Sequence, residues 1–148
     1  MRGINQLVLE LLTLLLLLCE AGVLVSGRTH VHLKNIVGSD VIVHCKSKND
    51  DLGLHTISNE QEYEWSFRPN VFQTTLFYCY VSWARAPDFS FSFEAYDFVR
   101  DRYSCTGGSN SNNHDCYWLF APEGVYFSDP KTNTWNFRYP WPKPTPQV

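Results

Sequence analysis

The residues best suited to chemistry near the start of the chain are two histidines, His30 and His32. Side chains two residues apart on a strand point to the same face, as two ligands of one metal ion would. A zinc site needs at least three protein ligands, and no third ligand is apparent from the sequence. Histidines in this setting are more typical of a solvated strand face, and we therefore predict no bound metal and no other cofactor.

Nucleophilic catalysis needs a nucleophile and a base within hydrogen-bonding distance. His44 and Cys45 are neighbours in the sequence. Adjacent side chains on a strand point to opposite faces, however, and we expect Cys45 to be oxidised. The pair therefore does not predict a cysteine enzyme.

Paired carboxylates suited to glycoside hydrolysis are the second catalytic arrangement to consider. The candidates are Asp50, Asp51, Glu60, Glu62 and Glu64. Glu62 and Glu64 alternate with large aromatic residues, which is the pattern of an outward, solvated strand face. Asp50 and Asp51 more typically shape a turn, because aspartate accepts hydrogen bonds from nearby backbone amides. The sequence thus predicts a protein that is not an enzyme.

Strands must position these side chains, because apolar and polar residues alternate along almost the whole chain after Arg28. The expected strands centre on residues 31–33, 41–45, 63–67, 76–83, 89–94, 116–120, 125–127 and 135–139, with turn residues between them. We predict an all-β fold, a small antiparallel β-sandwich of about seven to eight strands. Its aromatic core should include Trp65, Phe77 and Trp118.

Composition indicates a single folded domain. Of the 148 residues, 44% are hydrophobic and 16% aromatic, while 18% are charged. The formal net charge is −3 and the basic residues do not cluster, so nucleic acid is not an expected partner.

The first 27 residues have the pattern of a secretory signal peptide. Arg2 is followed by the apolar run 11–18 and then by small residues before Arg28. This run is shorter than the roughly 20 residues of a membrane span, so we expect cleavage and no membrane insertion afterwards. We divide the chain into a signal peptide (1–27), a β-sandwich domain (28–139) and a proline-rich C-terminal tail (140–148). The processed protein should be extracellular and monomeric.

Four of the five cysteines lie beyond the signal peptide: Cys45, Cys79, Cys105 and Cys116. An even number in an oxidising compartment predicts two disulfides. The sequence allows three pairings, among which we favour Cys45–Cys116 with Cys79–Cys105. A disulfide between distant strands would tie the two sheets together.

Several motifs follow one another in a distinctive order: Val41-Ile42-Val43-His44-Cys45-Lys46-Ser47-Lys48-Asn49-Asp50-Asp51-Leu52-Gly53, Tyr63-Glu64-Trp65-Ser66-Phe67, Thr75-Leu76-Phe77-Tyr78-Cys79, Tyr96-Asp97, Arg100-Asp101, Cys116-Tyr117-Trp118 and Glu123-Gly124-Val125-Tyr126. With its four cysteines, this series resembles the plant self-incompatibility protein S1 family, also called S-protein homologues, over about residues 31–127. The asparagine-rich insert before Cys116 and the proline-rich tail depart from the family pattern.

The resemblance implies a small secreted plant protein with a β-sandwich and two disulfides. The best-understood members act in the stigma, where each is a ligand read by a receptor on incompatible pollen. We therefore expect a non-enzymatic recognition ligand that binds a cell-surface receptor, in pollen rejection or reproductive signalling. A secreted carbohydrate-binding or defence module, using aromatic residues on one sheet face, is the alternative.

A sandwich without a catalytic set generally functions through its loops. The candidate binding loops are residues 47–51, 84–88 and 107–115. Their candidate contact residues are Lys48, Asn49, Asp50, Asp51, Arg85, Asp88, Asn110, Asn112, Asn113 and His114. Arg100 and Asp101 are expected to form an ion pair or turn anchor. Trp135 and Trp141 lie outside the main motifs, and the sequence does not determine which of them remains exposed.

Overall fold

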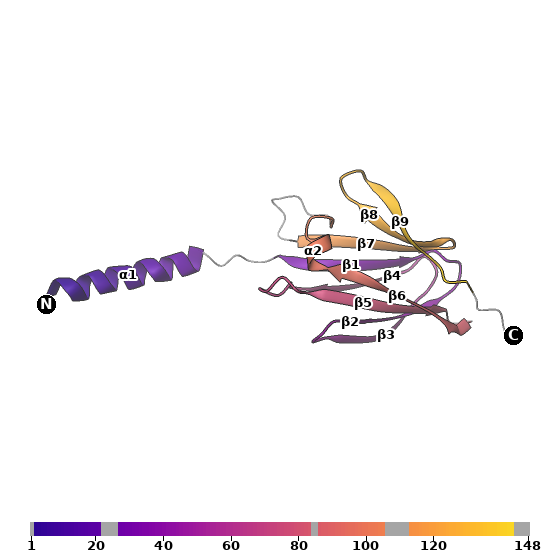
Figure 1. The fold of residues 1–148 in the computed structure, drawn as a ribbon, viewed down its shortest axis with the longest axis horizontal. Helices are drawn as coiled ribbons and strands as arrows, with labels where there is room; N and C mark the ends of the chain where they lie inside the picture. The colour runs from indigo at the N-terminus through magenta and orange to yellow at the C-terminus, as the bar shows by residue number, and fades with distance from the viewer. Residues whose placement is uncertain (1, 22–26, 84–85, 106–112, 144–148) are drawn as a thin grey trace.

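The structure is a computed structural model that describes residues 2–21, 27–83, 86–105 and 113–143. Helix α1 (Arg2–Ala21) comes first and lies apart from two stacked sheets (Figure 1). The elements of the sheets are β1 (Arg28–Asn35), β2 (Val41–Lys46), β3 (Asp51–Ile57), β4 (Glu62–Phe67), β5 (Leu76–Trp83), β6 (Ala86–Asp97), a short helix α2 (Phe98–Asp101), β7 (Asn113–Ala121), β8 (Gly124–Asp129) and β9 (Thr134–Pro140). Neither described helix is long and apolar enough to cross a membrane.

The two sheets confirm the predicted all-β sandwich. One has the strand order β4-β1-β7-β8-β9 and the other β3-β2-β5-β6. The prediction of an all-antiparallel arrangement is wrong at one position, because β1 and β7 pair in parallel, with Val31 opposite Cys116. Parallel neighbours need a long crossover connection. Here the chain between β1 and β7 builds the whole second sheet and also strand β4 of the first.

Strand β3 is the element that the sequence pattern did not reveal. Its apolar residues Leu52 and Leu54 alternate onto one face of the strand, whereas Ile57 falls on the other face. No simple alternation is therefore visible in the sequence. Gly53 has a positive φ of 76°, and the pairing register with β2 shifts between His44 and Lys46. An irregular edge strand of this kind buries few side chains, and periodicity detects it poorly.

Aromatic side chains are the largest members of the core between the sheets. Trp65, Phe77 and Trp118 are all buried, as predicted. The indole Nε1 of Trp118, on β7, donates a hydrogen bond of 2.9 Å to the carbonyl oxygen of Ala95, on β6. A single side chain thus links the two sheets by a hydrogen bond as well as by packing.

The disulfides join Cys45 to Cys79 and Cys105 to Cys116. The pairing that we favoured from the sequence is therefore wrong. Cys45 and Cys79 lie opposite each other on neighbouring strands β2 and β5, so their bridge lies within one sheet. The second bridge fastens the segment after α2 to β7. Neither bridge ties the two sheets together; packing across the core does so.

Two of the expected loops are shorter than predicted. Asn113, His114 and Asp115 already belong to β7, since the parallel register with β1 starts at Arg28 opposite Asn113. Residues 86–88 likewise belong to β6, which pairs with β5 from Ala86 onward. In both cases pairing with a neighbouring strand extends the ladder into polar or proline-containing sequence.

Candidate functional site

The turn between β2 and β3 presents the first group of predicted contact residues. Lys48, Asn49 and Asp50 are all exposed there. The Ser47 hydroxyl accepts hydrogen bonds from the amides of Asn49 and Asp50, and the Ser47 amide donates to the Asp50 carbonyl oxygen at 2.8 Å. These bonds give the exposed side chains a fixed backbone base.

A groove of about 430 Å³ lies beside this turn. Its walls come from the turn, from the end of β4 and from the β4–β5 connection, and its lining includes Phe67, Arg68 and Thr75. The same connection exposes two apolar side chains, Val71 and Phe72, at 88% and 82%. Charged, polar and aromatic groups therefore gather at one end of the sandwich.

Asp51 plays a structural part in addition to its predicted place in the turn. Its carboxylate lies 2.6 Å from His44 Nε2 and 3.2 Å from Lys46 Nζ, and it accepts the Gly53 amide at 2.9 Å. The contact with His44 and the hydrogen bond from Gly53 hold the pKa of Asp51 well below its usual range. His44 thus pairs with a carboxylate across the bulge between β2 and β3.

The remaining predicted contact residues do not gather around this groove. Strand β6, which contains Asp88, starts at the opposite end of the sandwich from the β2–β3 turn (Figure 1). Asn113 is exposed and His114 half-buried at the start of β7. Arg85, Asn110 and Asn112 lie outside the described residues. The β2–β3 turn and the described start of β6 therefore lie at opposite ends of the sandwich.

Arg100 and Asp101 confirm the expected ion pair and turn anchor. Arg100 donates from Nε and Nη2 to the two carboxylate oxygens of Asp101, at 2.7 and 2.6 Å. Asp101 is only 1% exposed and also accepts the Asp97 amide at 2.8 Å. The pair anchors α2 to the end of β6.

The two late tryptophans differ in exposure. Trp135 is 45% exposed on β9. Trp141 is half-buried; its indole donates to the Ala121 carbonyl oxygen at 2.7 Å and its ring packs edge-on against Trp83. Of the two tryptophans, Trp135 is therefore the exposed one, whereas Trp141 packs onto the sandwich although it falls in the predicted tail.

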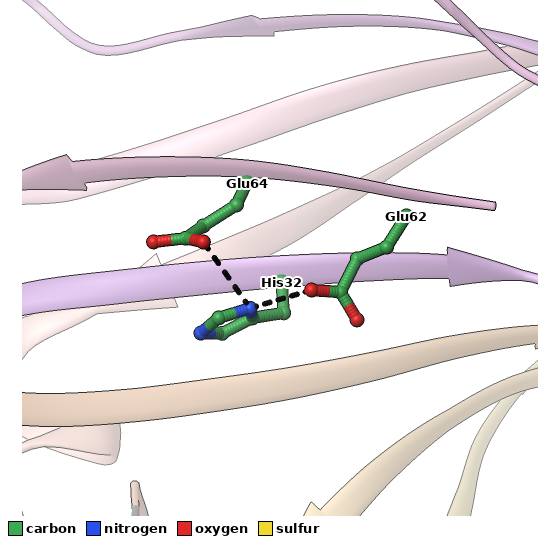
Figure 2. A group of neighbouring side chains, drawn as sticks. All are labelled: His32, Glu62 and Glu64. Atoms are coloured by element: carbon green, nitrogen blue, oxygen red, sulfur yellow. Dashed lines mark hydrogen bonds and ion pairs between the residues drawn. The ribbon is translucent and has the colours of Figure 1, made fainter.

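A second polar site, which the sequence analysis missed, lies on the outer face of the five-stranded sheet. His30 and His32 on β1 face Glu62 and Glu64 on the neighbouring strand β4. The Nδ1 atom of His32 lies 2.8 Å from Glu62 Oε1 and 3.9 Å from Glu64 Oε2. Figure 2 shows both glutamates directed at this nitrogen. The other oxygen of Glu64 lies 2.5 Å from His30 Nδ1.

Strand β7 supplies the other side of this polar site. Asp115 Oδ1 lies 3.0 Å from Nε2 of His32, and the Tyr117 ring stacks on the imidazole with centroids 4.3 Å apart. Burial lowers the pKa of His32, but the bonds to Asp115 and Glu62 outweigh it and leave the pKa above its ordinary value of 6.5. The sequence showed no third metal ligand near His30 and His32. In the fold, Glu62 and Glu64 of β4 lie close enough to be candidate ligands.

These features define a class of protein: a small, two-disulfide β-sandwich with exposed charged turns. Residues 30–141 match the family described as plant self-incompatibility protein S1. This chain belongs to that family.

Individual relatives agree with this assignment. S-protein homolog 5 of Arabidopsis thaliana is 40% identical over 98 residues, covering 65% of this chain and 67% of the relative. Self-incompatibility protein S1 of Papaver rhoeas is 30% identical over 98 residues, covering 66% and 65%. A solved structure of a self-incompatibility protein homologue, from a family described as small, highly stable, secreted plant proteins, has a TM-score of 0.52. At 17% identity, covering 80% of this chain and 93% of that chain, this last likeness supports the fold alone.

Proposed function

We propose that this protein is a secreted, non-enzymatic ligand that binds a cell-surface receptor protein through the β2–β3 end of its sandwich. One observation carries this proposal: the fixed charged turn of Lys48, Asn49 and Asp50 lies beside a groove whose flanking connection exposes Phe72. Aromatic side chains are typical of the centre of a protein interface, where most of the binding energy lies, and charged groups are typical of its rim.

Membership in the self-incompatibility protein S1 family supports a recognition role. The name of the Papaver rhoeas relative makes pollen rejection the first biological setting to test. A non-enzymatic role is supported by Cys45, whose sulfur is bonded to Cys79 and so is unavailable as a nucleophile.

Secretion is part of the same proposal. The described apolar side chains of α1, among them Leu7, Leu11 and Leu15, are exposed and do not contribute to the sandwich core. The first strand starts at Arg28, the residue before which cleavage is expected. Both observations support residues 1–27 as a removable signal peptide and residues 28–139 as the functional domain.

The alternative of carbohydrate binding is favoured by one feature, a tyrosine pair on the outer face of the four-stranded sheet. Tyr78 and Tyr80 lie on β5 with ring centroids 5.7 Å apart, and Tyr80 is 49% exposed. Exposed aromatic rings on a sheet face can stack on sugar rings.

Capture of the partner on intact cells distinguishes the two functions. Oxidised protein recovered from a secreting host would carry a photo-crosslinker at Asn49, with the same crosslinker at Asp40 on the opposite end as the control. A saturable, protease-sensitive partner that is captured from Asn49 on pollen or vegetative cells, and not from Asp40, supports the proposal. Binding that survives protease but disappears after digestion of cell-wall glycans would replace it with the carbohydrate-binding alternative.

A further inference from the structure

The polar site on the outer face of the five-stranded sheet and the β2–β3 turn belong to different sheets. We propose that His32, Glu62 and Glu64 bind a divalent cation of the zinc type there. The inference is independent of receptor binding.

The positions of the three candidate ligand atoms support this proposal. His32 Nδ1 and one oxygen from each glutamate all lie within 4.8 Å of one another. The ligand atoms of a tetrahedral zinc ion, with bonds of about 2.0–2.1 Å, are roughly 3.3 Å apart. The distances from His32 Nδ1 to Glu62 and Glu64, 2.8 and 3.9 Å, lie on either side of that separation. Small rotations of two partly exposed glutamate side chains would close the site.

The surroundings of the ligands match those of known metal sites. A histidine that binds a metal through one nitrogen usually donates its other N–H to a carboxylate, which fixes the ring and its tautomer. Asp115 lies 3.0 Å from His32 Nε2 and provides this carboxylate. His30 Nδ1 lies against the second oxygen of Glu64 and restrains that carboxylate in turn. The stacked Tyr117 ring further restricts the imidazole.

Burial and charge also favour a cation. The His32 side chain is 10% exposed, whereas those of Glu62 and Glu64 are 40% and 44% exposed. The imidazole is thus held in place while the carboxylates remain reachable from solvent. Three carboxylates, those of Glu62, Glu64 and Asp115, surround His32, and a divalent cation would offset their mutual repulsion.

The chemistry of the ligands selects the metal. One imidazole nitrogen and two carboxylate oxygens suit zinc and similar transition-metal ions, whereas magnesium and calcium prefer oxygen ligands alone. We therefore expect the site to bind Zn²⁺ in preference to Mg²⁺.

Calorimetric titration of the oxidised, secreted protein with ZnCl₂ and with MgCl₂ tests the proposal. We expect one equivalent of Zn²⁺ to bind and Mg²⁺ to bind at least tenfold more weakly. Because His32 is buried, the ligand variant is Glu62→Gln/Glu64→Gln, which keeps side-chain size and should keep the fold. Asp115→Asn should weaken zinc binding by about 10–100-fold, and the double variant should weaken it further.

His44→Gln is the matched control, because His44 is also a histidine next to a carboxylate but lies outside the proposed site. It should bind zinc as the wild type does, and near-UV circular dichroism should show all variants folded. The proposal is overturned if the wild type binds no zinc, if the folded double glutamine variant binds it unchanged, or if His44→Gln abolishes binding. In any of these cases the residues around His32 form an ion-pair network that stabilises the sheet.

Discussion

Cys45 and Cys79 occupy directly opposed positions on β2 and β5, with their Cα atoms 4.0 Å apart and both side chains fully buried. The disulfide therefore fastens the centre of the four-stranded sheet. Because β2 also pairs with β3, this bridge stabilises the strand pair that ends in the candidate binding turn. The second disulfide acts elsewhere, on the segment between α2 and β7.

The two disulfides should contribute unequally to stability. They are separated by 34 and 11 residues in sequence. On the chain-entropy account, removing them costs about 4 and about 3 kcal/mol, respectively. Guanidinium unfolding of Cys45→Ala/Cys79→Ala and Cys105→Ala/Cys116→Ala measures this difference. A larger loss of stability from the Cys105–Cys116 variant would contradict this order. Disulfide mapping that recovers a peptide joining Cys45 to Cys116 would contradict the pairing itself.

The hydrogen bond from Trp118 to Ala95 gives a second prediction. Trp118→Phe removes the indole donor, leaves the Ala95 carbonyl unpaired and opens a void in the core. We expect a loss of about 2–3 kcal/mol in the free energy of unfolding. Trp135→Phe makes the same change on an exposed face and should alter stability by less than about 0.5 kcal/mol. Equal losses from the two variants would show that Trp118 does not link the sheets energetically.

The buried ion pair gives a third prediction. Arg100→Met leaves the buried carboxylate of Asp101 without its charged partner, which should cost about 3–5 kcal/mol. Arg102→Met is the matched control, because Arg102 is exposed and its hydrogen bond to Gln73 is long, at 3.4 Å. Urea unfolding at neutral pH compares them. A loss below about 1 kcal/mol for Arg100→Met would mean that Asp101 is adequately held by backbone amides.

Alkaline stability depends on Tyr96. Burial raises the pKa of Tyr96 to about 12, although its hydrogen bond with Thr29 opposes the change. Because this pKa is higher in the folded state, the protonated tyrosine stabilises the fold fully below about pH 10, and this stabilisation is lost as the pH rises from about 10 through 12.

The expected loss at pH 11 is about 1 kcal/mol from Tyr96 alone. Tyr96→Phe removes this titration, so the variant should lose that much less stability than the wild type between pH 8 and pH 11. Denaturant unfolding at the two pH values measures the difference. Parallel losses in the two proteins would contradict the raised pKa.

Much of the sandwich was predictable because its buried strands alternate regularly. In β5, for example, Phe77, Cys79 and Val81 all face the core. The parallel pairing of β1 and β7 was not predictable, since alternation along a strand does not specify its neighbour. The disulfide pairing was missed for the same reason: it follows from the adjacency of β2 and β5.

The two polar sites differ in how far apart their residues lie in the sequence. The β2–β3 turn was recognisable because Asp50, Asp51 and their neighbours are consecutive turn-forming residues. The site around His32 is non-local, since Glu62 is 30 residues away and Asp115 is 83 residues away. Each set of residues alone has the pattern of a solvated strand face. A search for two strands that could pair, one with alternating histidines and the other with alternating glutamates, would have indicated this site.

The central claim, receptor binding through the β2–β3 end, is tested most directly by one charge reversal made at both ends of the sandwich. Asp50→Lys changes the candidate turn, and Asp40→Lys makes the same change in an exposed position of the β1–β2 connection. Saturation binding of the two folded variants would be measured on the intact cells that yield the partner. We predict that Asp50→Lys weakens binding by about tenfold or more and that Asp40→Lys leaves it unchanged. Equal affinities for the two variants and the wild type, or a loss confined to Asp40→Lys, would contradict the claim.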